Sequence, residues 1–148
     1  MVYKKVAIGS DHAGYELKVI LKEYLQSKGI EVVDFGTDSP ESVDYADYAH
    51  PLAFAVENGE CEIGFTICGS GNGINITANK HQGIRAALCW IPEISRLARA
   101  HNDANICSLP GRFVSVNDAK EIVNLFLETP FDGGRHEKRI QKIPLTTK

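Results

Sequence analysis

Short apolar runs recur along the chain and predict five β-strands. Each run is a few residues long, is rich in Val, Ile, Ala or Phe, and is bounded by glycine or polar residues. Such runs are typical of buried strands. The expected strands cover residues 6–8, 32–35, 63–68, 84–88 and 106–109.

Between these runs, apolar residues return at the spacing of three or four positions that an α-helix requires. The first such segment contains Leu17, Leu21 and Leu25 and ends at Gly29. Further helices are expected over 45–56, in a short turn after residue 73, from Pro92 to His101, and between Ser115 and Leu127. This alternation of strands and helices predicts an α/β fold, with a parallel sheet covered by helices on both sides.

Two positions carry specific predictions about helix ends. Pro51 falls inside the second helical pattern, where its ring has no N–H to donate. We therefore expect that helix to begin late or to kink there. Ser115, followed three residues later by Asp118, resembles a capping signal and predicts the start of the last long helix.

A basic stripe follows the glycine pair at 133–134. Its members recur at helical spacing: Arg135, Lys138, Arg139 and Lys142. One interpretation is a solvated charged face, which is the usual role of such a stripe. The other is a clamp for a phosphate group, because the arginine guanidinium is a rigid fork matched to phosphate oxygens.

Length and composition indicate one globular domain spanning residues 1–148. With 43% hydrophobic and 24% charged residues the chain is not disordered, and a net charge of −3 gives no reason to expect nucleic acid. No apolar run approaches the ~20 residues that cross a bilayer, and the N-terminus lacks a signal-peptide pattern. The four cysteines form no Cys-x-x-Cys pair, which argues against a structural zinc site or a disulfide framework and favours a reducing, cytoplasmic setting.

The clearest chemical signal is the segment 65–73, where Cys68 ends an apolar run and glycines alternate through 69–73. Glycines let a loop turn tightly and leave its backbone N–H groups uncovered. A helix starting near Ile74 would point its N-terminus at a group beside this thiol. Such surroundings stabilise an anion and favour the thiolate form of a cysteine. The segment therefore predicts a site for chemistry that passes through an oxyanion.

Two nucleotide-binding hypotheses fail on the sequence. Residues 9–14 have the glycine spacing of a P-loop, but Tyr15 and Glu16 stand where the motif needs Lys followed by Ser or Thr. The second loop lacks the third glycine of a dinucleotide fingerprint, because that position is Ile74. Both loops still follow strands, where open α/β sheets bind their ligands.

Groups able to move protons follow these strands and close a helix. They are Asp11, His12, Cys68, Ser70 and His101. Taken singly, each residue type also has a structural interpretation. A lone cysteine is usually packed in a core, and an aspartate at a helix start usually caps it. Their convergence on strand ends beside a glycine loop favours a catalytic site.

With these residues the chain resembles the type B ribose-5-phosphate isomerases, a family that also holds the galactose-6-phosphate isomerase subunits. The resemblance spans nearly the whole chain. The matching segments are 9–14, 36–37, 43–45, 67–73, 78–80, 83–86, 98–99, 101–105, 110–112 and 133–139.

The resemblance implies a Rossmann-like three-layer αβα sandwich with a five-stranded parallel sheet. It also implies a homodimer or homotetramer whose sites lie between subunits, with the tail from about 130 to 148 completing a neighbour's site. The implied reaction belongs to the pentose phosphate pathway. It interconverts ribose 5-phosphate and ribulose 5-phosphate through a cis-enediolate, without metal or cofactor and without nucleic-acid or membrane partners.

Residue roles follow from the same match. Cys68 corresponds to the base that moves a proton between C2 and C1; some members carry instead a Glu at the position that is Ile74 here. His101 corresponds to the residue that opens the sugar ring, with Asp11 beside it. The expected ligands are His12, Tyr45 and Asn102 for the sugar, Arg112, Arg135 and Arg139 for the phosphate, and the loop residues Gly69, Ser70, Gly71, Asn72 and Gly73.

Physical chemistry agrees with these roles. Removing a proton beside a carbonyl leaves an oxyanion that the loop N–H groups would bind, and one such donor is commonly worth ~3 kcal/mol. Ser70 would pass a proton between O1 and O2.

Two alternatives stay open. The same chemistry with another sugar gives an allose-6-phosphate or galactose-6-phosphate isomerase. Galactose-6-phosphate isomerases pair two different chains. This chain contains Asp11, Cys68 and His101, which favours an enzyme that needs no second kind of chain. The second alternative is a non-catalytic sugar-phosphate sensor, which would need the arginines and the glycine loop but no thiol paired with an imidazole.

Overall fold

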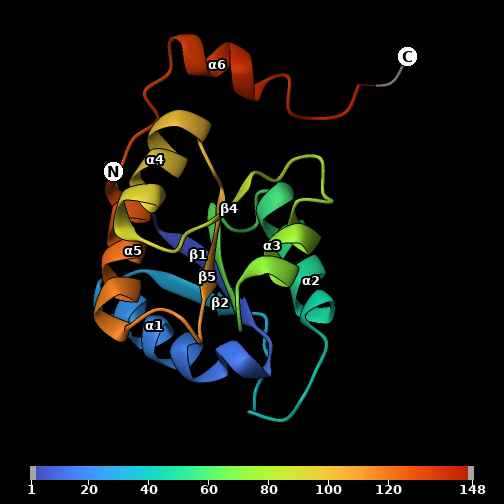
Figure 1. The fold of residues 1–148 in the computed structure, drawn as a ribbon, viewed down its shortest axis with the longest axis vertical. Coiled ribbons are helices and arrows are strands. Elements are labelled where there is room, and N and C mark those ends of the chain that lie inside the picture. The colour runs from blue at the N-terminus through green and yellow to red at the C-terminus, as the bar shows by residue number, and fades with distance from the viewer. Residues whose placement is uncertain (1–2, 147–148) are drawn as a thin grey trace.

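A computed structural model describes residues 3–146 and shows a five-stranded parallel sheet in the order β2-β1-β3-β5-β4 (Figure 1). The strands are β1 (Lys5–Ser10), β2 (Glu31–Asp34), β3 (Ile63–Cys68), β4 (Ala86–Leu88) and β5 (Ile106–Pro110). The chain winds outward from β1 to β2 and then returns to β3 on the other side of β1. Ligands of open α/β sheets bind where the winding reverses, so the carboxyl ends of β1 and β3 are the expected position of a ligand site.

Helices cover both faces of the sheet and confirm the predicted three-layer α/β sandwich (Figure 1). One face carries α1 (Tyr15–Ser27) and α5 (Val116–Glu128), with α4 (Pro92–Asn102) packed against α5. The other face carries α2 (Tyr45–Glu57) and the short α3 (Asn72–Ala78). A 3₁₀ turn, η1 (His12–Gly14), follows β1, and α6 (Arg135–Ile140) projects beyond α4 at one end of the molecule.

The central strand β3 shows why its sequence is an uninterrupted apolar run. All six of its residues are buried, because helices lie on both sides. Phe65 faces α5 and meets Phe126 edge to face with ring centroids 5.6 Å apart. Gly64 faces α2, where an added Cβ would lie 2.8 Å from Leu52 Cδ2. The glycine therefore lets α2 pack close to the sheet.

The element boundaries agree with the sequence pattern to within about two residues. The α2 helix begins at Tyr45 and runs through Pro51, so of the two expectations at this proline the late start is wrong, and the kink stays a prediction. The α3 helix begins two residues earlier than expected, because Gly71 adopts a left-handed conformation (φ +81°) that starts the helix at Asn72. The fourth strand is shorter than expected, since residues 84–85 lie outside the ladder.

The capping prediction is confirmed. Ser115 Oγ accepts a hydrogen bond from Asp118 N at 3.1 Å and starts α5.

Among the helices within residues 3–146, none combines the length and the apolar character that crossing a membrane demands.

A buried ion pair fastens the loop after β2 to the end of β1. Lys18 on α1 has a side chain only 2% exposed, and its Nζ lies 2.7 and 2.8 Å from the two carboxylate oxygens of Asp34. The same ammonium donates to the Thr37 carbonyl oxygen at 2.7 Å. Thr37 N in turn donates to the Ser10 carbonyl oxygen at 2.8 Å. Lys18 thus holds the backbone immediately before Asp11.

Replacing Lys18 with methionine is expected to lower the free energy of unfolding by about 3 kcal/mol or more, because the Asp34 carboxylate loses its buried partner. Urea denaturation measures the change. The matched control is Lys22→Met, which removes a cation 3.2 Å from the same carboxylate but 35% exposed. An exposed pair is worth about 1 kcal/mol or less, so equal effects of the two variants would contradict this interpretation.

The pH dependence follows from the titration of Asp34. Burial would raise the pKa of the Asp34 carboxyl, but hydrogen bonds from Lys18 and the Gly36 N–H outweigh it and hold that pKa below its ordinary value of 3.8. The stabilisation is therefore present above pH ~4 and is lost as the pH falls through the lowered value in the folded state. The difference in the free energy of unfolding between wild type and Lys18→Met should shrink as the pH falls through this range.

Candidate active site

The carboxyl ends of β1, β3 and β5 meet at one edge of the sheet and bring together most of the predicted site residues. Asp11 directly follows β1, and its N–H donates to the Ile67 carbonyl oxygen at 3.2 Å. The carbonyl oxygen of Cys68 accepts from Gly111 N at 2.8 Å, and that of Gly69 accepts from Arg112 N at 3.0 Å. Three segments far apart in the sequence thus surround the glycine loop.

Cys68 ends β3 on the side of the sheet that faces α2 and α3. It is only 3% exposed and packs with Ala49 and Ile74 in a small apolar cluster. The Cys68 side chain is therefore almost entirely covered in the single chain. A substrate carbon has to approach within ~3–3.5 Å of a base, so a base role for Cys68 depends on the small part of its surface that stays exposed.

The glycine loop is held closely by its neighbours. A Cβ at Gly71 would lie 2.5 Å from Leu88 Cδ1, and one at Gly73 would lie 2.4 Å from the Tyr45 ring. Ser70 Oγ accepts a hydrogen bond from Asn72 N at 3.2 Å. The Asn72 N–H, one of the loop donors expected to be uncovered, is therefore already hydrogen-bonded. Its acceptor is Ser70, the residue expected to pass a proton between O1 and O2.

Asp11 and His12 start the 3₁₀ turn after β1. Asp11 Oδ1 accepts from Ala13 N at 3.0 Å and from Gly14 N at 3.1 Å, so this carboxylate caps the turn. His12 Nδ1 accepts from Val43 N at 3.1 Å. In the neutral ring the proton then sits on Nε2, which leaves that atom as a donor for an oxygen of a ligand.

Tyr45 and Arg112 flank the same loop. Tyr45 is the first residue of α2 and covers Gly73 with its ring. The guanidinium of Arg112 lies beside Gly69, where an added Cβ would be 3.4 Å from Arg112 Nη1. The edge therefore combines a thiol, a carboxylate, an imidazole, a phenol and a guanidinium around a glycine-rich turn.

The other predicted site residues lie at the opposite, amino-terminal edge of the sheet. His101 and Asn102 end α4 a few residues before Ile106, which starts β5 and pairs with Gly64 at the start of β3. β5 spans five residues. At ~3.3 Å per residue the two edges are about 13 Å apart. The expected pairing of the His101 imidazole with the Cys68 thiol does not occur within one chain.

Two arginines without a role in the sequence analysis shape the end of α4. Arg99, which is buried, donates from Nη1 to Asp103 Oδ1 at 2.8 Å and to the Ala104 carbonyl oxygen at 2.7 Å. Arg85 donates from Nε to the Asn102 carbonyl oxygen at 2.9 Å. These bonds fix the turn that follows His101, in which Asp103 adopts a left-handed conformation (φ +45°).

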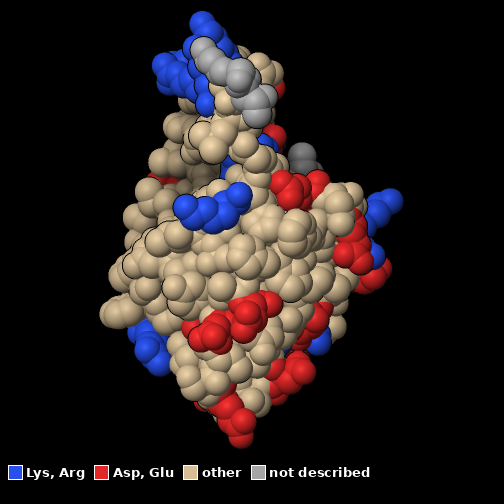
Figure 2. All heavy atoms as spheres, turned by 90° about the vertical axis from the view of Figure 1, so that its right-hand side faces the viewer, with Lys and Arg blue, Asp and Glu red and all other residues tan. Residues whose placement is uncertain are grey.

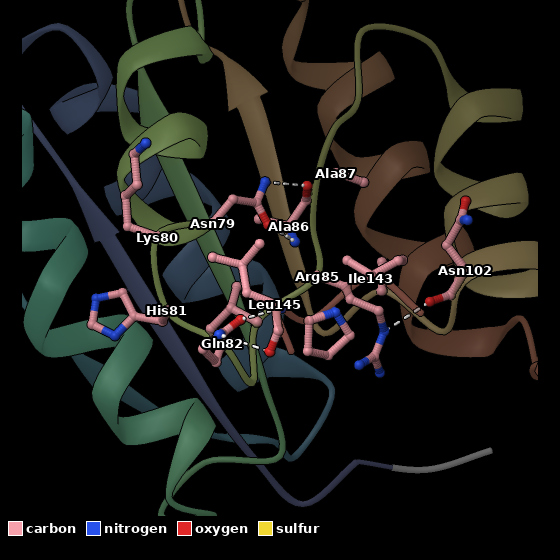
Figure 3. A pocket seen from close by; sticks show the side chains of 13 residues that line it. Asn79, Lys80, His81, Gln82, Arg85, Ala86, Ala87, Asn102, Ile143 and Leu145 are labelled. Atoms are coloured by element: carbon pink, nitrogen blue, oxygen red, sulfur yellow. Dashed lines mark hydrogen bonds between the residues drawn. The ribbon is translucent and has the colours of Figure 1, made fainter. Parts of the chain in front are cut away.

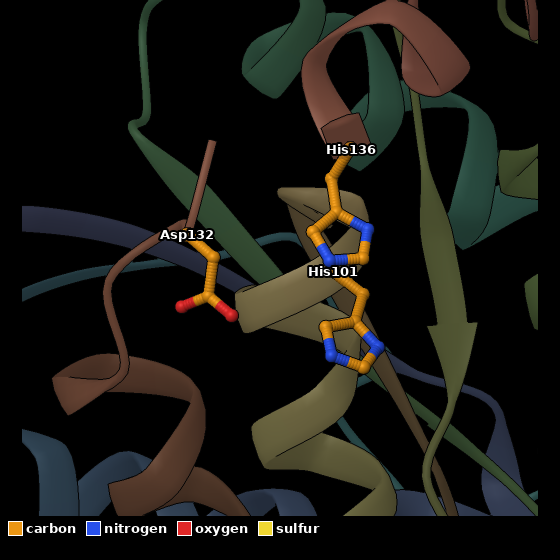
Figure 4. A group of neighbouring side chains, drawn as sticks. All are labelled: His101, Asp132 and His136. Atoms are coloured by element: carbon orange, nitrogen blue, oxygen red, sulfur yellow. The ribbon is translucent and has the colours of Figure 1, made fainter. Parts of the chain in front are cut away.

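His101 is stacked on His136, a residue that the sequence analysis did not single out (Figure 4). The ring centroids are 4.4 Å apart and the planes differ by 13°. Partial burial, and then the positive charges of His101 and Arg135, lower the pKa of His136. His136 belongs to α6, so this stack also fixes the predicted basic stripe beside His101.

The basic stripe forms one turn and a half of exposed helix at that end of the molecule. Arg135, Lys138 and Arg139 are all exposed on α6. Figure 2 shows Lys and Arg side chains gathered at the top of the molecule, where α6 lies, whereas acidic side chains predominate on the body below. The predicted phosphate ligands therefore fall into two groups, with Arg112 at one edge and Arg135 and Arg139 at the other.

A cavity of about 710 Å³ lies at the amino-terminal edge and not beside Cys68 (Figure 3). The loop after α3 and the start of β4 line one side, and Ile143, Pro144 and Leu145 close it from the tail. Gln82 holds the tail in place: its Oε1 accepts from Leu145 N at 3.0 Å. Because Leu145 is nevertheless 82% exposed, the tail covers the cavity only partly.

Comparisons with known proteins cover almost the whole chain. The profile of the ribose/galactose isomerase family matches residues 6–143. Ribose-5-phosphate isomerase B of Escherichia coli is 45% identical over 140 residues, which are 95% of this chain and 94% of that protein.

Solved structures agree. A ribose 5-phosphate isomerase of Thermotoga maritima is 55% identical, with a TM-score of 0.94 over 95% of this chain and 97% of that chain. Ribose-5-phosphate isomerase B of Mycoplasma genitalium, solved with bound ribulose-5-phosphate, is 40% identical, with a TM-score of 0.92 over 97% of this chain and 95% of that chain. On this similarity of sequence and fold, the chain belongs to the ribose/galactose isomerase family of enzymes.

Proposed function

We propose that the protein is an aldose–ketose isomerase that interconverts ribose 5-phosphate and ribulose 5-phosphate, using sites shared between two copies of the chain. The observation that carries the proposal is the gathering of Asp11, Cys68 and Arg112 around one glycine loop. The Escherichia coli relative is named for this reaction, and the Mycoplasma genitalium relative holds its ketose product. The reaction moves protons, which these side chains are suited to exchange.

The proposed chemistry has three steps. His101 protonates the ring oxygen while Asp11 receives the proton of the O1 hydroxyl, which opens the sugar ring to the aldehyde. Cys68 then removes the proton from C2, and backbone N–H groups of Gly69–Gly73 stabilise the cis-enediolate. Ser70 passes the O2 proton to O1, and Cys68 returns its proton to C1 to give the ketose.

The separation of the two halves of the site supports sharing between chains. One chain presents Cys68 and Arg112 at the carboxyl edge and His101 and Arg135 at the amino edge, about 13 Å apart by the rise of β5. A two-fold axis between two copies would bring opposite edges together and generate two complete sites. A homodimer, alone or paired into a homotetramer, satisfies this requirement.

In the proposed assembly the tail from about residue 130 completes the neighbour's site. The α6 helix packs on α4 and projects away from the sheet, so its basic face is available to another copy (Figure 1). Residues 147 and 148 of that tail lie outside the described residues. We treat residues 1–148 as one domain that works as part of an oligomer, in the cytoplasm, where its four free cysteines stay reduced.

Phosphate binding by the tail gives a specific prediction. Arg135 and Arg139 lie four residues apart on one face of α6, so both can contact one phosphate. Because a hydrogen bond to a charged group is worth about 1.5–3 kcal/mol, Arg135→Ala and Arg139→Ala should each raise KM for the phosphorylated sugar by about tenfold or more. The control is Lys138→Ala on the same helix, which should change KM less than about twofold. Unchanged KM in both arginine variants would mean that the stripe is only a solvated face.

The function itself is tested by side-by-side assays with ribose 5-phosphate, allose 6-phosphate and galactose 6-phosphate. We expect the highest kcat/KM with ribose 5-phosphate. Preference for a six-carbon sugar phosphate would contradict the proposed substrate but keep the chemistry. Saturable binding of sugar phosphate without any turnover would contradict the isomerase proposal and identify a sensor.

A further inference from the structure

A cluster of metal-ligating side chains surrounds His101 and includes two residues that the proposed isomerisation does not use. His101, Asp132 and His136 each offer one ligand atom, and these atoms all lie within 4.8 Å of one another. Figure 4 shows the two imidazoles next to each other, with the Asp132 carboxylate on one side of them. We propose that these three side chains form a binding site for a divalent transition metal ion of the zinc class.

The donor set suits such an ion. Two imidazole nitrogens and one carboxylate oxygen are ligands that zinc and neighbouring metals accept, and a fourth position remains for water. Zinc–nitrogen bonds of ~2.0–2.1 Å put tetrahedral ligand atoms about 3.4 Å apart. The present cluster must therefore contract by little more than 1 Å, and the stacked rings must turn about their Cβ–Cγ bonds until one nitrogen of each faces the ion.

The backbone allows this contraction. His101 is fixed at the end of α4, and Asp132 is tied to the same helix because its N–H donates to the Ala100 carbonyl oxygen at 2.9 Å. His136 follows Gly133 and Gly134, which adopt φ values of +68° and +57°. A Cβ at either glycine would meet no atom within 4 Å. The glycine pair therefore offers a point at which α6 can swing His136 toward the other two ligands.

Binding would have two consequences. The ion would join α6 to α4 and immobilise the arginines that α6 carries. It would also occupy the imidazole of His101, so it should inhibit isomerisation. The second consequence rests on the proposed function, whereas the binding site itself does not.

A second histidine pair supplies the matched control. His50 Nδ1 lies 2.8 Å from His81 Nε2, and His81 Nδ1 lies 3.4 Å from Glu57 Oε1. In this group the two ring nitrogens that face each other are hydrogen-bonded. His50 lies on α2 and His81 lies in the loop after α3. Losing His50 removes one imidazole from the protein without touching the proposed metal site.

The test is calorimetric titration of the metal-free full chain with Zn²⁺ in the absence of sugar phosphate. We expect one ion per chain, and binding at least tenfold weaker in His136→Gln and in Asp132→Asn. His50→Gln should bind as the wild type does. Absence of saturable binding, undiminished binding in both cluster variants, or loss of binding in His50→Gln would each overturn the proposed site. Circular dichroism of each variant confirms that it is folded.

Activity measurements separate the metal site from the proposed function. Zn²⁺ should inhibit the wild type reversibly, and a chelator should restore its activity. It should inhibit His136→Gln less, with the rate of each protein compared with its own metal-free rate. Binding at the three residues without inhibition would support the metal site and contradict the role proposed for His101. Absence of binding in an active enzyme would overturn the metal site and leave the isomerase proposal intact.

Discussion

Replacing Cys68 with alanine is expected to lower kcat for ribose 5-phosphate by between about 10² and 10⁴-fold, the range that loss of a general base produces. KM should change little, because Cys68 itself makes no contact with the phosphate in the proposed site. The physical reason is that C2 holds its proton tightly, and Cys68 is the only base proposed for it. Steady-state kinetics with a coupled assay measure both constants.

The control for this variant is Cys61→Ala. Cys61 is also buried, and burial raises the pKa of its thiol. It lies before β3, at the far end of the strand from Cys68, so its loss should leave kcat within about twofold of the wild type. Because Cys68 packs with Ala49 and Ile74, urea denaturation must show that the alanine variant is folded at the assay temperature. A folded Cys68→Ala protein with near wild-type kcat would exclude the thiol as the base.

Mixing two inactive variants is expected to restore activity. If the site is shared, a dimer of one Cys68→Ala chain and one His101→Ala chain has one site that lacks both groups and one that lacks neither. Random mixing of equal amounts makes half of the dimers mixed, so activity should recover to about a quarter of that of the wild type. Co-expression with two different affinity tags, followed by purification on both, isolates the mixed species.

The purified mixed dimer should show about half of the wild-type kcat, with an unchanged KM at its one intact site. Two controls accompany it: each variant alone should stay inactive, and a mixture of Cys68→Ala with Ser70→Ala should not recover. Both substitutions of that second mixture fall on the carboxyl edge, so every site in its mixed dimer retains one defect. Failure of the first mixture to recover would contradict sharing between chains.

Local sequence patterns were sufficient for most of the fold. Apolar runs bounded by glycine or polar residues located the five strands, and helical spacing located the helices, because burial on one or two faces constrains residue type at every second or every third to fourth position. The Ser115 cap was predictable because its bond to Asp118 N spans only three residues. Pro51 misled the prediction of the α2 start, since the packed apolar face of that helix outweighs one missing donor.

The chemistry of the candidate site was predictable as a set of residue types, but not as an arrangement. Asp11 turned out to cap η1, and Ser70 to hold Asn72, because these bonds depend on the conformation of each turn. His136 was not assigned a role, since its stacking on His101 is recognisable only when the end of α4 and the start of α6 are placed together. Arg99 was missed although its partner Asp103 lies only four residues further along the chain, a spacing that the sequence itself displays.

The sequence by itself determined the α/β class, the element order and the residues available for proton transfer, because periodicity and residue chemistry are local properties of a chain. The tertiary structure alone decided that Cys68 is covered and that His101 lies at the opposite edge of the sheet from it. The physical reason is that parallel strands collect all of their carboxyl ends at one edge, whereas a helix that returns the chain to the next strand ends at the other. A residue at the carboxyl end of a strand and a residue at the end of the helix before the next strand are therefore separated by about the length of a strand.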